Sequence, residues 1–578
     1  MEMVKFKIDG IELEVPKGTT VLEAARKIGI EIPTLCYLKD VNNPASCRAC
    51  LVEVGPRLIA SCALVAENNM DVKTNTQKVR DARKTVVELL LSNHKRECTT
   101  CIRSENCELQ KLAKELNIRD IKYEGERTKG IIDDSSTSVV RDQEKCILCG
   151  RCISTCGNVQ TVHAIGWARR GFATNVTPAY DRALSETVCV NCGQCIIACP
   201  VGALHEKENI KDVWKALNDK EKYVVVQTAP AVRVAIGEEF GLPMGTRVTG
   251  KMAAALRKLG FDKVFDTDFA ADLTIMEEGT ELLKRLNTGK NLPLMTSCCP
   301  GWVKFVEHQY PDMTDNLSTC KSPHQMEGAL IKSYFAQKMG IDAKNIVVVS
   351  IMPCVAKKFE ENREELSCDG LADVDYVLTT RELAQMIKEA GIDFINLSDE
   401  EFDNPFGEST GAGVIFGATG GVAEAALRTI FELLSGKELE TVDYTAVRGV
   451  EDIKEAVIEL PDGRKINAAV AHGLSNARKV LEMVRSGEKH FDFIEVMACP
   501  GGCVNGGGQP IVNAKVKEKV DVRLERAKGI YSEDKDLPLR KSHKNPYIKK
   551  LYDEFLKEPN SEVSHKYLHT HYVKRDRF

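Results

Sequence analysis

The sequence predicts a multidomain protein, with small α+β units in its N-terminal third and an α/β architecture in the remaining two-thirds. At 578 residues the chain is longer than one hydrophobic core usually serves. Its 22 cysteines gather in short groups. From about residue 210, β-branched runs at 223–226 and 346–349 alternate with helical patterns at 251–259 and 381–390. Such alternation is typical of buried parallel strands covered by helices.

Composition and charge exclude some classes of function. With 43% apolar residues the chain can form ordinary globular cores, and a net charge of −5 gives no basic excess that would indicate nucleic acid as a partner. No apolar stretch has transmembrane length. The first residues, MEMVKFKI, alternate like a strand and show neither a signal-peptide pattern nor twin arginines. We therefore expect a cytoplasmic protein without a membrane partner.

The cysteines are too sparse for a disulfide scaffold, and clustered cysteines in a reducing compartment indicate metal or redox sites. Four lie within 36–62, three within 98–107 and eight within 146–199. A further four are Cys299, Cys354, Cys499 and Cys503. The cysteines left over are Cys298, Cys320 and Cys368.

The first unit begins with a hairpin-like pattern that turns at residues 16–18, followed by a helix capped at Thr19-Thr20. This start suits a small β-grasp ferredoxin fold. Four thiolates suit a 2Fe–2S cluster, although a structural zinc site can also use four cysteines. The cysteine-rich sites downstream favour iron and sulfur. The four candidate ligands are Cys36, Cys47, Cys50 and Cys62.

The second unit combines one histidine with three cysteines: His94, Cys98, Cys101 and Cys107. A helix over residues 81–92 would deliver the histidine to the thiolates. By itself this ligand set is more common for zinc than for an iron cluster.

The third unit carries a doubled C-x2-C-x2-C-x3-C motif, the pattern of two-cluster bacterial ferredoxins, in which the fourth cysteine of each run binds the other cluster. Gly157 replaces the proline expected after the first run, and a loop is inserted between the halves. One 4Fe–4S cluster is assigned to Cys146, Cys149, Cys152 and Cys199. The other is assigned to Cys189, Cys192, Cys195 and Cys156.

Three motifs carry the remaining cysteines: TSCCPGW at 296–302, MPCVAKK at 352–358 and EVMACPGGCVNGGGQ at 495–509. They supply four thiolates, the number a cubane 4Fe–4S cluster takes, and their glycines would let backbone approach a bulky group. In this order the motifs resemble the signatures of the iron–iron (FeFe) hydrogenases, in the monomeric multi-cluster clostridial-type form. The likeness covers nearly the whole chain.

The resemblance implies a fold, cofactors and an activity. It implies a two-lobed α/β catalytic domain with parallel sheets, reversible conversion of 2H⁺ and 2e⁻ to H₂, and an H-cluster. That cluster joins a 4Fe–4S cubane to a two-iron unit carrying CO, CN and a bridging dithiolate amine. The likeness also extends to the second unit, whose histidine then ligates a 4Fe–4S cluster. One 2Fe–2S and three accessory 4Fe–4S clusters would form an electron relay.

The resemblance also assigns a pocket around the two-iron unit. Cys503 would be the bridging ligand, and Lys357 a charge-assisted donor to a cyanide, although a lone lysine is usually a solvated surface group. Alanine stands at 229 where the family often has serine. His324 stands where glutamine is often found, and it could restore a donor or titrate near neutral pH. The other expected wall residues are Ala229, Pro230, Ala231, Met352, Pro353, Gly417 and Met497.

Protons need a route as well. Cys298 stands beside a ligand but is not needed as one, so a relay role competes with that of a small core residue. Glu278, Glu281 and Arg285 share one face of a predicted helix over residues 276–285, which by pattern alone is an exposed ion-pair stripe. The resemblance maps these three residues and Ser318 onto the family's proton path.

Two cysteines and the tail remain. Cys320 follows Ser318 closely and is expected to approach it, whereas Cys368 receives no role. The tail resembles a segment that forms a separate small subunit in some periplasmic relatives. Its histidines, His565, His569 and His571, are expected at the surface rather than on a metal.

The predicted domains are 1–79 (2Fe–2S), 80–126 (histidine-ligated 4Fe–4S), 127–209 (two 4Fe–4S), 210–522 (catalytic) and 523–578 (wrap). We expect a monomer that exchanges electrons with ferredoxin or a similar carrier, uses H₂ and protons as substrates, and depends on hydrogenase maturation proteins. The alternatives are a non-catalytic iron–sulfur assembly protein, a sensory hydrogenase-like protein, and a subunit of an electron-bifurcating complex. No added signalling domain, extra C-terminal cluster motif or flavin motif supports them.

Overall fold

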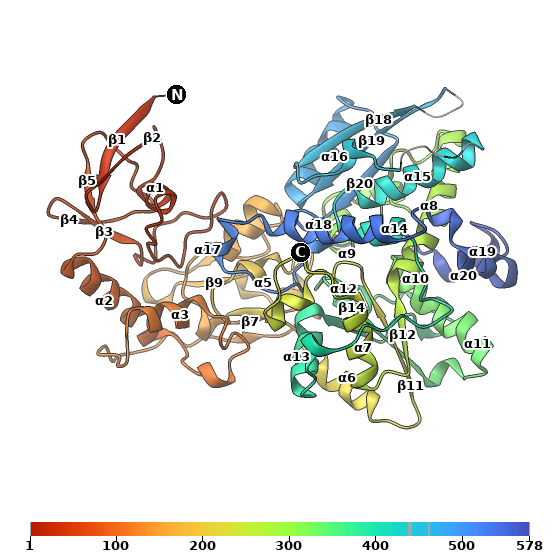
Figure 1. Cartoon of the computed structure of the whole chain (residues 1–578), viewed down its shortest axis with the longest axis horizontal. Helices are drawn as coiled ribbons and strands as arrows, with labels where there is room; N and C mark the ends of the chain where they lie inside the picture. The colour runs from red at the N-terminus through yellow and green to blue at the C-terminus, as the bar shows by residue number, and fades with distance from the viewer. Residues whose placement is uncertain (1, 437, 439–441, 460–462, 577–578) are drawn as a thin grey trace.

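The computed structural model describes residues 2–436, 438, 442–459 and 463–576. The cysteine-rich N-terminal third lies at one end of the molecule and the larger α/β body at the other (Figure 1). The C-terminal segment returns across the body.

The first unit is a five-stranded mixed sheet in the order β2-β1-β5-β3-β4. The helix α1 (Val21–Lys27) packs on it and starts where predicted. The Thr20 side chain accepts a hydrogen bond from the Glu23 amide, and the Glu23 carboxylate accepts one from the Thr20 amide. This reciprocal cap satisfies two backbone donors that helix ends leave unpaired. The strands are β1 (Met3–Ile8), β2 (Ile11–Pro16), β3 (Leu51–Val54), β4 (Arg57–Ala60) and β5 (Asp71–Lys73).

Two smaller cysteine-rich parts follow. The helix predicted before His94 is present as α2 (Gln77–Asn93), and α3 (Glu108–Glu115) begins directly after Cys107. The doubled motif lies on α4 (Arg151–Ser154) and α5 (Gln194–Ala198), beside a three-stranded sheet. Its strands are β6 (Ile132–Asp133), β7 (Val139–Asp142) and β10 (Leu204–Glu206), and the inserted loop forms the hairpin of β8 (Gly166–Ala168) and β9 (Asn175–Thr177).

The first sheet of the α/β body is parallel throughout, in the order β12-β11-β14-β17. The predicted helices are present as α7 (Thr249–Leu259) and α13 (Thr380–Glu389). Burial of the strands on both faces explains their continuous β-branched runs. The strands are β11 (Tyr223–Thr228), β12 (Lys263–Asp266), β14 (Ile346–Met352) and β17 (Tyr376–Thr379).

The second sheet corrects one expectation, because it is mixed rather than parallel. Its order is β13-β20-β19-β18, and β18 pairs antiparallel with β19. Strands joined by so short a connection can only pair in opposite directions, since a parallel return needs a crossover of a dozen or more residues. The strands are β13 (Leu294–Met295), β18 (Ile453–Glu459), β19 (Lys465–His472) and β20 (Phe493–Met497).

The helix predicted over residues 276–285 is part of a much longer one, α8 (Thr267–Thr288). Asp266 caps its start, and Gly289, with a φ of 66°, ends it. The C-terminal segment adds α18 (Val522–Asp536), α19 (Pro546–Leu551) and α20 (Glu562–Leu568). The helices α19 and α20 contact α8 and α10 (Pro323–Leu330), respectively, at the far end of the body (Figure 1).

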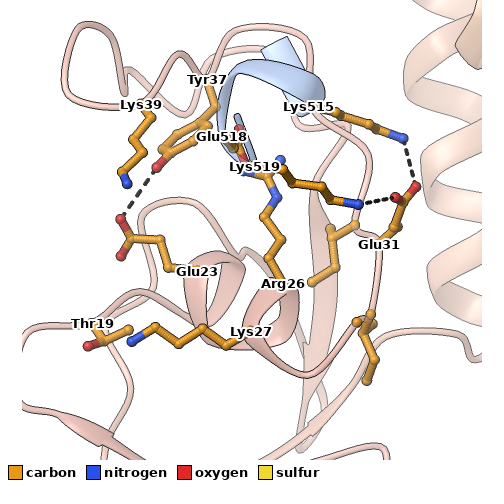
Figure 2. A pocket seen from close by; sticks show the side chains of 13 residues that line it. Thr19, Glu23, Arg26, Lys27, Glu31, Tyr37, Lys39, Lys515, Glu518 and Lys519 are labelled. Atoms are coloured by element: carbon orange, nitrogen blue, oxygen red, sulfur yellow. Dashed lines mark hydrogen bonds and ion pairs between the residues drawn. The ribbon is translucent and has the colours of Figure 1, made fainter. Parts of the chain in front are cut away.

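A charged cavity marks the junction between the first unit and the segment around α17 (Ala514–Lys517) (Figure 2). Lys515 and Lys519 each lie 3.4 Å from the Glu31 carboxylate, and Arg26 pairs with Glu518. These ion pairs tie the N-terminal unit to the chain that follows the last cysteine motif. Among the described helices, none combines the length and apolar character needed to cross a bilayer.

Candidate functional site

Four cysteines from the three motifs meet between the two sheets of the body. Cys354 follows β14, Cys299 precedes α9 (Pro300–Gln309), and Cys499 and Cys503 follow β20. Burial raises the pKa of Cys499, and the nearby Cys354, Cys299 and Cys503 raise it further. Burial likewise raises the pKa of Cys354 to about 12. Bare thiolates are costly in such a place, so this donor set is suited to bind a cationic iron cluster.

The glycines after Cys503 lie tightly against neighbouring backbone. A Cβ on Gly506 would lie 2.1 Å from the Pro353 carbonyl oxygen, and a Cβ on Gly507 would lie 2.5 Å from the Cys192 carbonyl oxygen. Both distances are far below van der Waals contact. These glycines therefore make room for neighbouring backbone, so that the last motif packs against both the loop after β14 and the doubled-motif unit.

Lys357 occupies a buried network at the start of α12 (Lys357–Glu360). Its ammonium donates to the Cys298 carbonyl oxygen at 3.1 Å and to Glu360 Oε2 at 2.7 Å. Lys357 and His324 hold the pKa of the Glu360 carboxyl down at about 2, against the effect of burial. Within the described part of the chain, these two acceptors leave the third N–H of the ammonium available to the pocket.

His324 does not behave as the sequence suggested. Its Nε2 lies 2.5 Å from Glu360 Oε2, and its Nδ1 lies 3.2 Å from Ser350 Oγ. Burial and the charge of Lys357 lower the pKa of His324 to about 4. The ring is therefore neutral at neutral pH, and both of its nitrogens are engaged. The sequence analysis missed Glu360, although its place three residues after Lys357, one helical turn away, was a usable signal.

The expected pocket wall comes from both lobes. The Ala229 amide donates to the Ile351 carbonyl oxygen at 3.0 Å, and Gln509 Nε2 donates to the Ala231 carbonyl oxygen at 2.8 Å. A Cβ on Gly417 would meet the Ala231 amide nitrogen at 3.4 Å, so this glycine packs closely on the same loop. The loop of residues 229–231 is thus fixed through its backbone, with no hydroxyl at its first position.

The other wall residues lie at the ends of strands. Met352 ends β14 within the core of the first sheet, whereas Met497 ends β20 within the core of the second. The Pro353 carbonyl oxygen accepts from the Gly508 amide at 2.8 Å. Pro230 is buried between the two alanines. Met352 and Met497 thus belong to the cores of different sheets, and each lies two residues before a candidate ligand cysteine.

The candidate proton path is a buried row of polar groups, so the alternative of an exposed ion-pair stripe is wrong. Ser318 Oγ donates to Glu281 Oε2 at 2.9 Å, and Arg285 Nη2 lies 2.6 Å from Glu281 Oε1. Glu278 is only 4% exposed, and burial raises its pKa to about 8. Burial and the nearby Glu278 charge raise the pKa of Cys298. The row therefore leads from Arg285 to Cys298.

Of two residues near this row, Cys320 lies where the sequence predicted and His569 does not. Cys320 is fully buried, and its amide donates to Ser318 Oγ at 3.3 Å, as its position suggested. His569 was expected at the surface, but it is 8% exposed and bonded to Glu277. His565 and His571 are exposed. No local pattern distinguishes the buried histidine, because its partners come from segments far away in the chain.

In the first accessory set the thiols approach one another in two pairs. Cys50 Sγ and Cys62 Sγ are 3.4 Å apart, and Cys36 forms a hydrogen bond with Cys47 that lowers the pKa of Cys36 to about 5. A 2Fe–2S cluster has two irons, each taking two thiolates, whereas a zinc ion gathers four thiolates around one point. The pairwise arrangement fits the 2Fe–2S cluster.

In the second set, His94 directly follows α2 and is 7% exposed. Its Nδ1 is buried and has no hydrogen-bond partner among the described residues. Burial lowers the pKa of this histidine and raises that of Cys107. A neutral imidazole with an unused lone pair fits the role of a cluster ligand beside the three cysteines.

The cysteines of the doubled motif gather in the two groups that an exchange of fourth cysteines requires. Cys199 lines one cavity together with Cys146, Cys149 and Cys152. Burial raises the pKa of Cys195, and the charges of Cys192, Cys189, Cys156 and Cys199 raise it further, in that order. The fourth cysteine of each run therefore lies with the first three of the other.

The doubled-motif unit also adjoins the central thiols. The charge of Cys354 contributes to raising the pKa of Cys192. Gln160 Nε2 donates to the Ala498 carbonyl oxygen at 2.9 Å, and Gln194 Nε2 donates to the Asn505 carbonyl oxygen at 3.0 Å. These contacts place the accessory set of Cys189, Cys192, Cys195 and Cys156 next to the central set.

Family models match most of the chain. Residues 222–507 match the C-terminal domain of the iron only hydrogenase large subunit, and residues 520–575 match the iron hydrogenase small subunit. The N-terminal matches are a 2Fe-2S iron-sulfur cluster binding domain (1–77), an NADH-ubiquinone oxidoreductase-G iron-sulfur binding region (83–122) and a 4Fe-4S dicluster domain (145–203).

Curated relatives match over the full length. The chain is 53% identical to the NADP-reducing hydrogenase subunit HndD of Solidesulfovibrio fructosivorans, with 100% of each chain covered. It is 44% identical to iron hydrogenase 1 of Clostridium pasteurianum, over 98% of this chain and 99% of that one. A solved structure of apo FeFe hydrogenase HydA1 from Chlamydomonas reinhardtii is 44% identical, covers 64% of this chain and 99% of its own, and superposes with a TM-score of 0.57.

Proposed function

The chain belongs to the iron-only (FeFe) hydrogenase family and interconverts H₂ with protons and electrons. On this basis we propose which residues bind the cofactor and carry the protons and electrons. Cys299, Cys354, Cys499 and Cys503 would hold the cubane of the H-cluster, and Cys503 would also serve the two-iron unit. When bound, the H-cluster supplies an iron site for H₂ with CO and CN ligands, and a bridging dithiolate amine that exchanges protons.

The pocket residues bind and enclose this cofactor. Lys357 directs its remaining N–H toward a cyanide, as a charge-assisted donor. Glu360, which accepts from Lys357 at 2.7 Å, sets the direction of that ammonium. Met352 and Met497 exclude water from opposite lobes. Ala229 offers no hydroxyl, so a cyanide near it has one side-chain donor fewer than a serine would give.

Protons pass along the buried row beneath the pocket. Arg285 and Glu281 form its outer part, Ser318 relays through its hydroxyl, and Glu278 delivers the proton to the Cys298 thiol. Because burial raises the pKa of Glu278 to about 8, this carboxyl is protonated at neutral pH and can act as a donor. Cys298 passes the proton into the pocket and is reprotonated from Glu278.

The domains 1–79, 80–126 and 127–209 would hold one 2Fe–2S and three accessory 4Fe–4S clusters, which would supply a path for electrons. The cluster on Cys189, Cys192, Cys195 and Cys156 is the innermost, because its unit contacts the last cysteine motif. The domains 210–522 and 523–578 form the catalytic body and its wrap. The redox partner is ferredoxin or a similar carrier. Maturation proteins insert the two-iron unit in a reducing, cytoplasmic setting.

The convergence of the four central thiols beside Cys298 and Lys357 carries this proposal. The test is hydrogen evolution from reduced viologen under strict anaerobiosis, before and after the two-iron cofactor is supplied. We expect activity only after addition. Cys503→Ser should abolish it, whereas Cys368→Ser, a change in the small hairpin of β15 (Ser367–Cys368) and β16 (Leu371–Ala372), should not. No activity from protein with all cubanes loaded would refute the assignment.

The match to a protein named as a subunit of an NADP-reducing hydrogenase favours one alternative to a free monomer. The chain would then be the hydrogen-converting subunit of a larger NADP-linked assembly. Purified chain should reduce ferredoxin with H₂ if it works alone. A need for added subunits before either ferredoxin or NADP⁺ is reduced, with viologen activity intact, would favour the assembly.

A further inference from the structure

The C-terminal tail forms one wall of the region through which protons are proposed to pass. The Thr570 amide donates to the Thr319 carbonyl oxygen at 2.7 Å, and the Lys321 amide donates to the Leu568 carbonyl oxygen at 2.8 Å. The tail thus pairs, strand-like, with the segment directly after Ser318. The helix α20, which leads into this pairing, contacts α10 (Figure 1).

His569, on the paired stretch of the tail, joins the two sides of the path. Its Nδ1 lies 2.8 Å from Thr319 Oγ1, and its Nε2 lies 3.1 Å from Glu277 Oε2. A carboxylate only accepts hydrogen bonds, so Nε2 carries a proton toward Glu277. The other ring nitrogen, Nδ1, shares a hydrogen bond with the Thr319 hydroxyl. His569 is thereby bonded both to α8 and to the segment of Ser318.

Glu277 is a fixed anchor for this bridge. It is fully buried, and besides His569 it accepts from Tyr552 Oη at 2.6 Å and from the Asn560 amide at 2.7 Å. Three donors satisfy a buried carboxylate well, so Glu277 holds its place. It immediately precedes Glu278 in α8, although its side chain points to the tail and not along the row.

Thr319 transmits the position of the bridge to the path. Its amide lies 3.3 Å and 3.1 Å from the two oxygens of Glu281, next to the bond from Ser318 Oγ. The direction of the Glu281 carboxylate therefore depends on where residues 318 and 319 are held. Loss of the hydrogen bond at Thr319 would then change the position of Glu281, a proposed proton carrier, although His569 itself is bonded to Thr319 and Glu277 rather than to Glu281.

We propose that His569 is a positioning residue for proton transfer, acting through Thr319 on Glu281, an inference that rests on the proposed proton path. The bond from Thr319 to Nδ1 keeps the Thr319 amide and the Ser318 hydroxyl aligned on Glu281. Without it the tail still packs, but the alignment that proton transfer needs is looser.

The test compares two single variants that cut the same bond from opposite sides. His569→Gln keeps a donor toward Glu277 but gives up the ring nitrogen that is bonded to Thr319 Oγ1, and Thr319→Val removes the hydroxyl while leaving the backbone amide. Each should lower turnover about fivefold, the effect of one lost hydrogen bond, and raise the solvent isotope effect. The double variant should be no worse than either single one.

A matched control and a second readout separate positioning from stability. The exposed His565 ring lies beside His569, with centroids 4.2 Å apart and planes tilted by 44°, so His565→Ala should leave turnover and the isotope effect unchanged. In protein lacking the two-iron unit, infrared pH titration should show shifted carboxyl bands in His569→Gln and Thr319→Val, and none in His565→Ala. Melting temperature and cluster loading should match the wild type.

The outcomes distinguish failure of the proposed proton path from failure of the positioning role of His569. If Glu281→Gln leaves turnover unchanged, the proton path itself is wrong and this inference falls with it. If Glu281→Gln abolishes turnover while His569→Gln and Thr319→Val leave rate, isotope effect and carboxyl titration unchanged, only the role of His569 is refuted. Slower turnover that follows loss of melting temperature or of clusters would likewise refute positioning.

Discussion

Replacing Glu278 with glutamine tests the proton path most directly. Glutamine keeps the size and hydrogen-bonding shape of the side chain but has no exchangeable acid proton. General acid–base groups typically contribute about 100-fold to 10,000-fold in rate, so we expect Glu278→Gln to lower hydrogen evolution by a factor in that range. All clusters should remain loaded, because Glu278 is not a ligand.

The magnitude of the stability effect follows from the burial of this side chain. Burial raises the pKa of Glu278 from its ordinary 4.5 to about 8, which corresponds to roughly 5 kcal/mol against ionisation in the folded state. Because the folded pKa lies above the unfolded one, the favourable contribution is complete below pH 4.5 and is lost as the pH rises through about 8. Glutamine has no such dependence.

The assay is hydrogen evolution from reduced viologen between about pH 6 and about pH 9, paired with urea unfolding at both ends of that range. Wild-type turnover should fall above about pH 8 as Glu278 loses its proton, whereas the variant should be slow and nearly flat. The free energy of unfolding of the variant relative to the wild type should rise by roughly 3 kcal/mol from the acid to the alkaline end, because the wild type keeps losing stability between about pH 6 and about pH 8.

Glu327→Gln is the matched control. Glu327 is fully buried on α10, neither of its oxygens has a hydrogen-bond partner among the described residues, and burial raises its pKa. It should show the same alkaline stabilisation with unchanged turnover. Glu278→Gln that retains more than about half of wild-type turnover would refute a relay role, and an equal loss in Glu327→Gln would mean that the effect is not specific.

Four further predictions concern the cofactors and their surroundings. Fully loaded protein should hold roughly 20 iron atoms per chain, and about 14 would mean that the catalytic centre is absent. Cys298→Ala should nearly abolish turnover with every cluster in place, and unchanged turnover would remove its relay role. Cys107→Ser should alter the reduced-state EPR signal of a single accessory cluster; an unchanged spectrum contradicts that ligand. Glu360→Gln frees Lys357 from a carboxylate 2.7 Å away, so the cyanide infrared bands of loaded protein should shift, and unmoved bands would show that Glu360 does not orient it.

Local patterns predicted the elements well where neighbours in the sequence are also neighbours in space. Thr20 and Glu23 lie within one helical turn, so the start of α1 was predictable from the sequence. The β-branched run at 346–349 needed only burial on both faces to form a strand of the first sheet. The antiparallel pairing of β18 was missed because the expectation of parallel sheets came from the β-branched runs at 223–226 and 346–349 and from the family resemblance, and not from the length of the connection between β18 and β19.

In the candidate site, too, the features set by nearby residues were predicted and those set by distant segments were not. The spacing of the cysteines identifies each thiol as a ligand candidate, because closely spaced ligands can reach one cluster whatever the rest of the chain does. The environment of His324 was misjudged, since Glu360 and Ser350 reach it from segments at least 26 residues away. A titration expected near neutral pH became a pKa of about 4 because burial and Lys357 both oppose charge on the ring.

The sequence alone determined the class of the protein, its motifs and the row of acids on α8, since these depend on residue type and short-range periodicity. The tertiary structure decided which acids are buried, which way Lys357 points, and that the tail histidine His569 reaches Glu277 and Thr319. Burial, pKa and hydrogen-bond partners arise from segments that meet only on folding. They depend on distances in space, and no spacing along the chain encodes those distances.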